Sequence, residues 1–435
     1  MATFQPSPQD GVTLVVQFVF YLVAFLGACY FLFYKRRFDF FTIGFASSLL
    51  YFLPGFFGYV RSSRDFAVGE PLLPATYAVF VMVLACILVG AMLFDHLDPG
   101  RPARPMRPIP LFMTTEFAAV VAALALIATL FAYGGALFAQ QKADVLAGIG
   151  RWHLLYRFAA MFAVVFATIR RQTAWAVVAF GLLLFDFFVG FRFGVVITVI
   201  AVAVVVLNRK GPQSLLGSEF RSMTMGLVVV GLVLVYKHIY VFVKLGLWDI
   251  VAQRLSSPRI LQLAVLNSEP FTTQSILNEI IAADLHTGGE HLKYLGNLLV
   301  PFATMLGAQS QSFNDLFQQQ LFGGVSGGLA NNIWAEMYAV GGWLAIGIAV
   351  ALYVLLLAIG SRLLMTARGA GLCLTVIVFT MIAFYIHRND VGFELTLIRR
   401  CLFIWLLIVV PAMLLVDVAA AVRRQQPGDI SSQAP

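Results

Sequence analysis

The polar segment at residues 246–331 decides how this chain is organised: it ends in FGGVSGG (322–328) and leads into NNIWAEMY (331–338). It is the one long polar interruption in a sequence of 435 residues. Apolar stretches follow one another before it, and three more come after it. Loops held by a rigid scaffold are where recognition usually takes place. We therefore expect the functional site to lie where this loop meets the ends of the apolar segments.

The composition predicts a membrane protein. Hydrophobic residues make up 60% of the chain and charged residues 11%, against about 25% charged in soluble domains. A bilayer can absorb this apolar surface in spans of about 20 residues, and helices satisfy their own backbone groups in lipid. The period-two alternation of a membrane β-barrel is absent. The predicted class is an all-α polytopic membrane protein.

We predict about eleven transmembrane helices and one large periplasmic loop. The predicted spans are roughly 12–34, 40–60, 75–94, 111–139, 152–169, 173–190, 194–208, 222–245, 331–360, 370–387 and 396–420. The predicted regions are an N-terminal transmembrane bundle (1–245), the large loop with short helices (246–330), C-terminal transmembrane helices (331–420) and a disordered cytoplasmic tail (421–435).

Basic residues predict the orientation. The net charge of +8 indicates topology and not nucleic-acid binding, because Lys and Arg accumulate on the cytoplasmic side of membrane proteins. They cluster at every second connection: 35–37, 101–107, 170–171, 209–221, 362–368 and 423–424. This predicts a bacterial inner-membrane protein with a periplasmic N-terminus, a cytoplasmic C-terminus and the large loop in the periplasm.

The sequence offers no signal for a nucleotide or a metal. No glycine-rich phosphate loop with its lysine is present. The four cysteines lie in apolar spans, and His286 and His291 are five residues apart, not the four that would align two ligands on one helix face. We therefore expect no cofactor. No internal repeat is visible, which disfavours an inverted-repeat transporter.

Three ionisable residues near the predicted outer helix ends are the main functional candidates. A charged side chain at the centre of a membrane helix costs about 2.5–3.5 kcal/mol, so such residues mark functional sites by default. Arg192 lies between glycines in a tight turn, Arg388 lies in a His-Arg-Asn-Asp cluster, and Glu336 follows the glycine-rich segment. The structural alternative for Glu336 is a salt bridge to an arginine. For Arg151 and Lys237 we favour simple contact with lipid head groups.

The loop has the residue types that suit sugars. Its carboxylates and amides can bind hydroxyl groups, and its aromatic side chains can cover the C–H faces of sugar rings. Four aromatic residues are candidates for this role: Trp248, Phe313, Phe317 and Trp334.

Three short motifs resemble the bacterial oligosaccharide repeat-unit polymerases (O-antigen polymerases) and, more distantly, the O-antigen ligases. FVGFRFGVV (188–196) is similar to a glycine–arginine turn between two middle spans of that family. NNIWAEMYAVGG (331–342) is similar to a Glu-x-Tyr and glycine stretch after its loop, and YIHRND (385–390) to an Arg-x-Asp-like turn before its last span. The resemblance covers residues 150–420, and the first four spans match only in hydropathy.

The resemblance implies a metal-independent glycosyltransferase that uses polyprenyl-diphosphate-linked oligosaccharides. The growing glycan would pass from its lipid diphosphate to the non-reducing end of a new lipid-linked unit. Four arginines would hold the diphosphate, because guanidinium forks match phosphate oxygens: Arg192, Arg388, Arg157 and Arg254. Three residues remain open as the catalytic base: Glu336, His286 and Asp390. Expected partners are membrane lipids, a chain-length regulator and a flippase, with no nucleic acid.

Three other functions stay open. An O-antigen ligase would transfer the glycan to the lipid A core and use a loop histidine, for which His286 and His291 are available. A flippase for lipid-linked oligosaccharides is a rival of another class. The simplest alternative is a scaffold whose outer arginines bind lipids.

Overall fold

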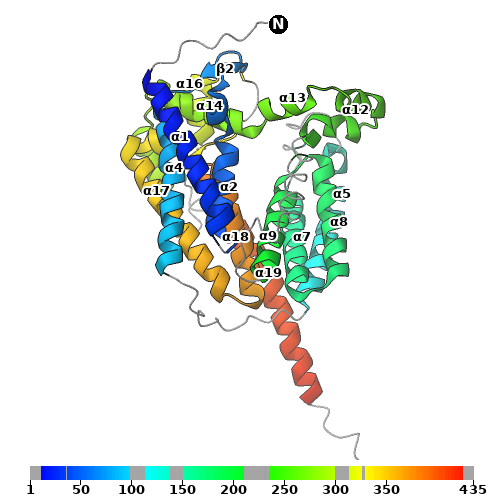
Figure 1. Ribbon diagram of the computed structural model, residues 1–435. Coiled ribbons are helices and arrows are strands. Elements are labelled where there is room, and N and C mark those ends of the chain that lie inside the picture. Colours follow the sequence, from blue (N-terminus) through cyan, green and yellow to red (C-terminus); the bar gives the residue numbers. More distant parts are fainter. Residues whose placement is uncertain are drawn as a thin grey trace, which may run out of the picture. The chain divides into compact units, whose positions relative to one another are not determined.

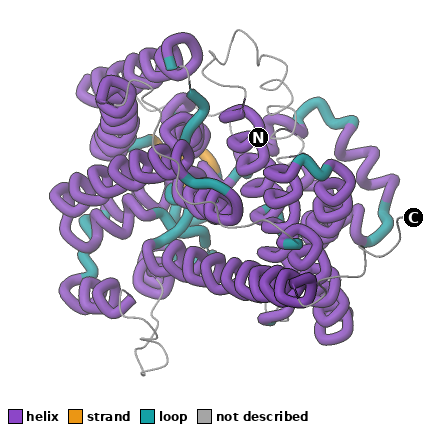
Figure 2. Tube along the Cα trace, turned by 90° about the horizontal axis from the view of Figure 1, so that it is seen from below, coloured by secondary structure: helices purple, strands orange, loops and turns teal. Residues whose placement is uncertain are grey.

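The described residues are almost entirely helical. The computed structural model describes residues 11–35, 37–97, 113–137, 145, 150–209, 231, 235–298, 313–325 and 329–424. Figures 1 and 2 show helices throughout, and the strands within the described part form one two-stranded hairpin.

Six helices in the described ranges are long and apolar enough to cross a membrane. They are α1 (Gly11–Cys29, continued by a π-helical turn Tyr30–Tyr34), α4 (Pro74–Leu97), α5 (Thr114–Leu137), α7 (Arg151–Arg170), α17 (Ile333–Thr366) and α19 (Val391–Arg424). Four apolar helices are shorter: α2 (Phe40–Tyr51), α8 (Thr173–Val189), α9 (Phe193–Arg209) and α18 (Gly369–Tyr385). A multi-pass helical membrane protein is therefore confirmed, and the count of about eleven spans stays a prediction.

The predicted span at 40–60 is wrong in its second half. Helix α2 ends at Tyr51, a short helix α3 covers Leu53–Phe57, and strand β1 (Tyr59–Arg61) pairs antiparallel with β2 (Val68–Pro71). Pro54 has no backbone N–H and its ring would clash with the preceding turn, so α2 cannot continue through it. Gly58 then adopts φ +83°, which turns the chain into the hairpin.

Two predicted regions fall partly outside the described residues. Of the predicted span 222–245, only residue 231 and residues 235–245 are described, and 235–244 are helical. At the C-terminus α19 continues to Arg424, and residues 425–435 of the predicted tail lie beyond the described part.

The loop segment, residues 246–330, contains five short helices within its described residues. They are α12 (Trp248–Leu255), α13 (Ile260–Leu266), α14 (Glu269–Ala282), α15 (Gly288–Leu298) and α16 (Phe313–Leu321).

The chain forms two compact units. Unit one comprises Met1–Ala103, Val206–Met365 and Val378–Ile398; unit two comprises Arg104–Val205, Thr366–Ile377 and Arg399–Pro435. In unit two, α7 packs against α5 and α8. In unit one, α1 packs along α4, as Figure 1 shows.

Helix α14 anchors the loop segment to the helices of unit one. It packs against α2, α3, α4 and β1. Asn278 Oδ1 accepts hydrogen bonds from Leu73 N and Thr76 Oγ1, both at 2.9 Å, and Ser275 Oγ accepts one from Arg61 N at 2.8 Å. These buried side-chain contacts fix the loop at the helix ends, where the candidate site lies.

Candidate functional site

Asn332 positions the start of α17, which carries Glu336. Its Oδ1 accepts hydrogen bonds from Trp334 N (2.9 Å) and Ala335 N (3.3 Å), which are backbone donors that a helix start leaves without an internal partner. Its Nδ2 donates to the carbonyl of Thr273 in α14 at 2.9 Å. The first turn of α17 is therefore tied directly to the loop segment.

Glu336 forms a buried pair with a histidine from the loop. The carboxylate is 1% exposed, and its Oε1 lies 2.8 Å from His291 Nε2. Its Oε2 accepts a hydrogen bond from Val391 N at 2.8 Å, at the start of α19. Glu336 therefore pairs with a histidine and not with an arginine. Because each carboxylate oxygen has a partner, the orientation of the buried side chain is fixed.

Asp390 caps α19 beside this pair. Its Oδ1 accepts from Phe393 N at 2.6 Å, and its Oδ2 accepts from Asn331 Nδ2 at 2.5 Å. Burial raises the pKa of Asp390, although these hydrogen bonds and the neighbouring His291 oppose the shift. Two predicted catalytic acids, Glu336 and Asp390, thus meet at the N-terminus of one helix, whose dipole favours negative charge.

Arg388, a predicted phosphate ligand, lies in unit one, two residues before Asp390. Its side chain is partly exposed. Its Nε is 2.9 Å from Glu269 Oε2, and the two side chains are 28% and 24% exposed. The guanidinium also lies over the ring of Tyr385, with 5.6 Å to the centroid. The Nε that faces Glu269 is buried, while the Arg388 side chain as a whole keeps 28% of its surface exposed, so a phosphate would first meet the exposed part of the side chain.

The neighbouring His387 is structural. It is fully buried, and its Nδ1 accepts a hydrogen bond from Trp334 Nε1 at 3.0 Å. Indole nitrogen can only donate, so Nδ1 carries no proton and the ring is the neutral Nε2–H tautomer. Nε2 then donates to Ser48 Oγ at 2.9 Å, and Ser48 donates to Gly44 O at 2.7 Å.

Two further candidates of unit one lie apart from these contacts. His286 is 54% exposed, stacks on Tyr338 and lies 3.3 Å from Asp284 Oδ1. Arg254 is exposed on α12, where its guanidinium lies over Phe242, 4.5 Å from the centroid. Neither contacts Glu336 or Arg388 in any hydrogen bond or ion pair among the described residues.

Arg157 belongs to unit two, where it holds a buried aspartate. Its Nε donates to Asp186 Oδ2 at 2.7 Å and its Nη2 to Oδ1 at 3.2 Å. His153 Nε2 lies 2.8 Å from the same Oδ1, and Asp186 is fully buried. These contacts occupy Arg157, so the geometry favours a structural role for it.

Arg192 lies half-buried in the turn between α8 and α9, also in unit two. Gly190 ends α8 with φ +111°. A Cβ on Gly194 would lie 3.1 Å from Arg157 Cγ and 3.4 Å from Asp186 Oδ2. The glycines of this motif thus make room for the turn and for the Arg157–Asp186 pair. A meeting of Arg192 with Arg388 stays a prediction.

Three of the four aromatic residues expected to face sugars are buried. Phe313, Phe317 and Trp334 are each 0% exposed, whereas Trp248 is 63% exposed. Phe313 and Phe317 pack on each other and Trp334 on His387. That expectation is wrong for these three, because they lie in the core formed at α16 and at the start of α17.

Glu269 and His291 are site residues that the sequence did not single out for these roles. Ser268, Glu269 and Pro270 form a recognisable helix start, but the pairing of Glu269 with Arg388 spans more than a hundred residues. From the sequence, His291 is a candidate for a ligase-type histidine but not for a partner of Glu336. Its contact with Glu336 has no signal in a single sequence.

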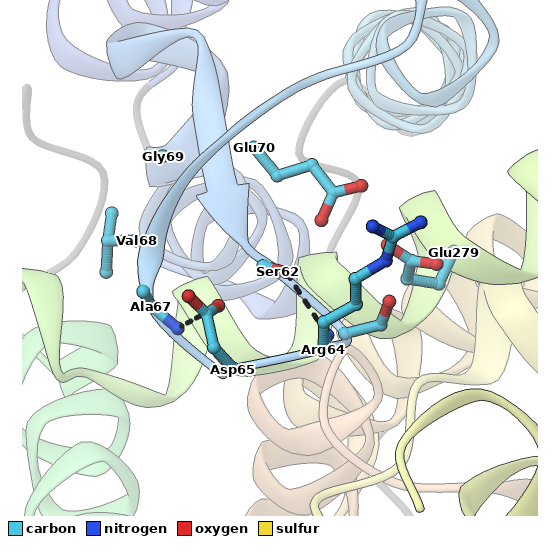
Figure 3. A pocket seen from close by; sticks show the side chains of 9 residues that line it. Ser62, Arg64, Asp65, Ala67, Val68, Gly69, Glu70 and Glu279 are labelled. Carbon is cyan, nitrogen blue, oxygen red and sulfur yellow. Dashed lines mark hydrogen bonds between the residues drawn. The ribbon is translucent and has the colours of Figure 1, made fainter. Parts of the chain in front are cut away.

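A separate open pocket of about 500 Å³ lies at the hairpin. It is lined by residues 62–65 and 67–70 of the hairpin and by Glu279 of α14. Figure 3 shows the Glu70 and Glu279 carboxylates facing the same space as the Arg64 guanidinium. Burial, followed by the hydrogen bond and charge of Glu279, raises the pKa of Glu70 to about 7.

No protein-family model, curated protein or solved structure matches this chain.

Proposed function

We propose that this chain is a metal-independent membrane glycosyltransferase that polymerises oligosaccharide repeat units carried on a polyprenyl diphosphate. The observation that carries the proposal is the convergence of Glu336, His291, Asp390 and Arg388 where the loop segment meets the starts of α17 and α19. Glycosyl transfer from a diphosphate requires a base for the acceptor hydroxyl and a cation for the leaving group. The acids and the imidazole can supply the base, and the arginine can supply the cation.

Arg388 is the proposed diphosphate ligand. Negative charge develops on the leaving diphosphate as the anomeric bond breaks, and an arginine already in place stabilises that charge. Arg388 would exchange Glu269 for phosphate oxygens when the lipid-linked donor binds. Its side chain is 28% exposed, which makes this exchange physically reasonable.

The Glu336–His291 pair is the proposed base. A carboxylate that orients an imidazole is a common arrangement for removing a hydroxyl proton. Here the acceptor hydroxyl would lose its proton to this pair as it attacks the anomeric carbon. Asp390 holds Asn331 and the start of α19 in place beside the pair.

The other three arginines predicted to hold the diphosphate have weaker support from their contacts. Arg157 is engaged with Asp186, and Arg254 lies over Phe242 on α12. Arg192 keeps its proposed role as a phosphate ligand, because it resembles the glycine–arginine turn of the polymerases.

An O-antigen ligase is the second candidate. It is favoured by one observation: the partner of Glu336 is a loop histidine, His291. Ligase and polymerase would share donor chemistry and differ in the acceptor.

The test is a strain that lacks this chain, complemented with variants. A polymerase predicts single repeat units on the lipid A core of the deletion strain, and a ligase predicts no glycan there. Accumulation of lipid-linked units on the cytoplasmic face would instead indicate a flippase.

Variants then test the site. Arg388→Ala, Glu336→Gln and His291→Gln are each expected to lower chain elongation by more than about 100-fold at normal protein levels. Arg259→Ala and Asp249→Asn, at exposed loop positions, are the matched controls and should support full-length glycans. Normal ladders from all three site variants would contradict the proposed site.

A further inference from the structure

An exposed aromatic platform lies at the boundary between the loop segment and α17. It consists of Asp284, His286, Tyr338 and Trp343. The rings of His286 and Tyr338 are nearly parallel, at 16° with centroids 6.1 Å apart. The Trp343 ring stands at 90° to that of Tyr338, also at 6.1 Å. Two flat ring systems are thereby held in a fixed, angled arrangement.

The platform combines accessible ring faces with accessible hydrogen-bonding groups. Trp343 is 46% exposed, and the His286 and Asp284 side chains are 54% and 73% exposed. Tyr338 is 9% exposed and contacts both of the other rings. Asp284 Oδ1 accepts a hydrogen bond from the Tyr338 hydroxyl at 3.1 Å and lies 3.3 Å from His286 Nε2.

A break in α17 produces this geometry. Residues five apart on a regular helix do not share a face, so Tyr338 and Trp343 would point apart. Gly341 and Gly342 interrupt the helix with φ/ψ of −163°/29° and 59°/−145°. On the loop side, Thr287 N donates to the carbonyl of Ala339 at 2.9 Å, which fixes His286 against Tyr338.

We propose that this platform binds a sugar ring of the acceptor oligosaccharide. The apolar C–H face of a pyranose would lie on Trp343, and its hydroxyl groups would bond to Asp284 and His286. Pockets that recognise small ligands generally combine aromatic walls with a few fixed polar groups. The inference rests on the proposed function, because Tyr338 lies two residues beyond Glu336 in α17. It gives His286 a role in acceptor binding in place of the catalytic role considered from the sequence.

The experiment measures saccharide binding to the full chain in lipid nanodiscs. The probe is the oligosaccharide released by mild acid from the host's own lipid-linked repeat units, titrated by calorimetry. Trp343→Ala and Asp284→Asn are each expected to raise the Kd by about tenfold or more. Trp152→Ala removes another exposed tryptophan, at 41% exposure, and should leave the Kd within about twofold.

The outcomes separate this inference from the proposed function. A Kd unchanged by Trp343→Ala, or no binding to the wild-type chain at millimolar probe, overturns the platform. Glu336→Gln should abolish elongation while binding the probe normally. If the platform variants lose the probe but the deletion strain still elongates glycans, the proposed function fails and the platform stands. If the deletion strain stops elongating while the platform variants bind and elongate normally, only the platform fails.

Discussion

The ion pair of Arg388 and Glu269 should matter for glycan elongation but contribute little to the free energy of unfolding. Their side chains are 28% and 24% exposed, and ion pairs that reach solvent contribute only about 0–1 kcal/mol. We therefore expect the charge-swapped double variant Arg388→Glu/Glu269→Arg to unfold within a few degrees of the wild type.

The same swapped variant should not elongate glycans, because the cation has moved to α14. Thermal unfolding in detergent and the glycan ladder of complemented cells measure the two effects. Recovery of normal chain lengths by the double variant would show that the pair acts only as a structural link.

The Arg157–Asp186 ion pair should contribute mainly to stability, in contrast to the Arg388–Glu269 pair. Asp186 is 0% exposed and its partner 11%, so Arg157→Ala would leave a buried charge without its main partner. Removing one member of a buried pair costs about 3–5 kcal/mol. We expect Arg157→Ala to be far less stable than Arg388→Ala, with Arg157→Leu/Asp186→Leu recovering much of the loss. Equal unfolding temperatures for the two alanine variants would contradict a structural Arg157.

At the scale of elements, the break in α17 at Gly341 and Gly342 requires a glycine. Gly342 has φ +59°, a conformation that costs a non-glycine residue about 1–3 kcal/mol. Gly342→Ala should lower the unfolding temperature. Gly347→Ala is the matched control: it lies in the helical part of α17, a Cβ there meets nothing within 4 Å, and alanine is the better helix former. A Gly342→Ala variant as stable as Gly347→Ala would mean that the break is not needed.

Glu70 of the hairpin lies beside Glu279 of α14, and its raised pKa makes the stability of the folded chain depend on pH. The folded pKa of Glu70 is about 7, and its unfolded pKa is near 4.3. Between these values the folded chain keeps a proton that the unfolded chain releases, so this contribution to stability falls as pH rises from about 4.3 to 7.

Glu279→Gln tests this link, because it removes the charge that helps to raise the Glu70 pKa. The variant should lose stability less steeply between pH 5 and 7 than the wild type, as measured by thermal unfolding across that range. Asp65→Asn, in the same pocket, should keep the wild-type slope. An unchanged slope in Glu279→Gln would contradict the contribution of Glu279 to the raised pKa of Glu70.

For the whole molecule, the sequence predicted the parts of the structure that follow from local chemistry. Hydropathy over about 20 residues identifies the spans because lipid burial is a property of each segment. The end of α2 could have been placed from Pro54, since proline stops a helix by itself.

The pairing of distant residues could not be predicted in the same way. Glu336 stands out in the sequence as a polar residue in an apolar helix, yet its partner His291 comes from a loop helix. The contacts of Glu269 with Arg388 and of Asn332 with Thr273 likewise join separate elements. Such contacts depend on how helices pack, and hydrophobic periodicity in a single membrane sequence carries almost no information about packing, because lipid and protein interiors are equally apolar.

The proposed chemistry depends on the orientation of the whole chain in the membrane. The alternation of basic clusters predicts the loop segment outside and the connection between α7 and α8 inside. Asp249→Cys in the loop should react with a membrane-impermeant maleimide in intact spheroplasts, because its side chain is exposed on α12. Thr173→Cys, exposed at the start of α8, should react only after lysis, and the wild-type chain gives the background from native cysteines. The reverse pattern would put Glu336, His291 and Arg388 on the cytoplasmic side, where the proposed transfer from an already translocated lipid diphosphate could not occur.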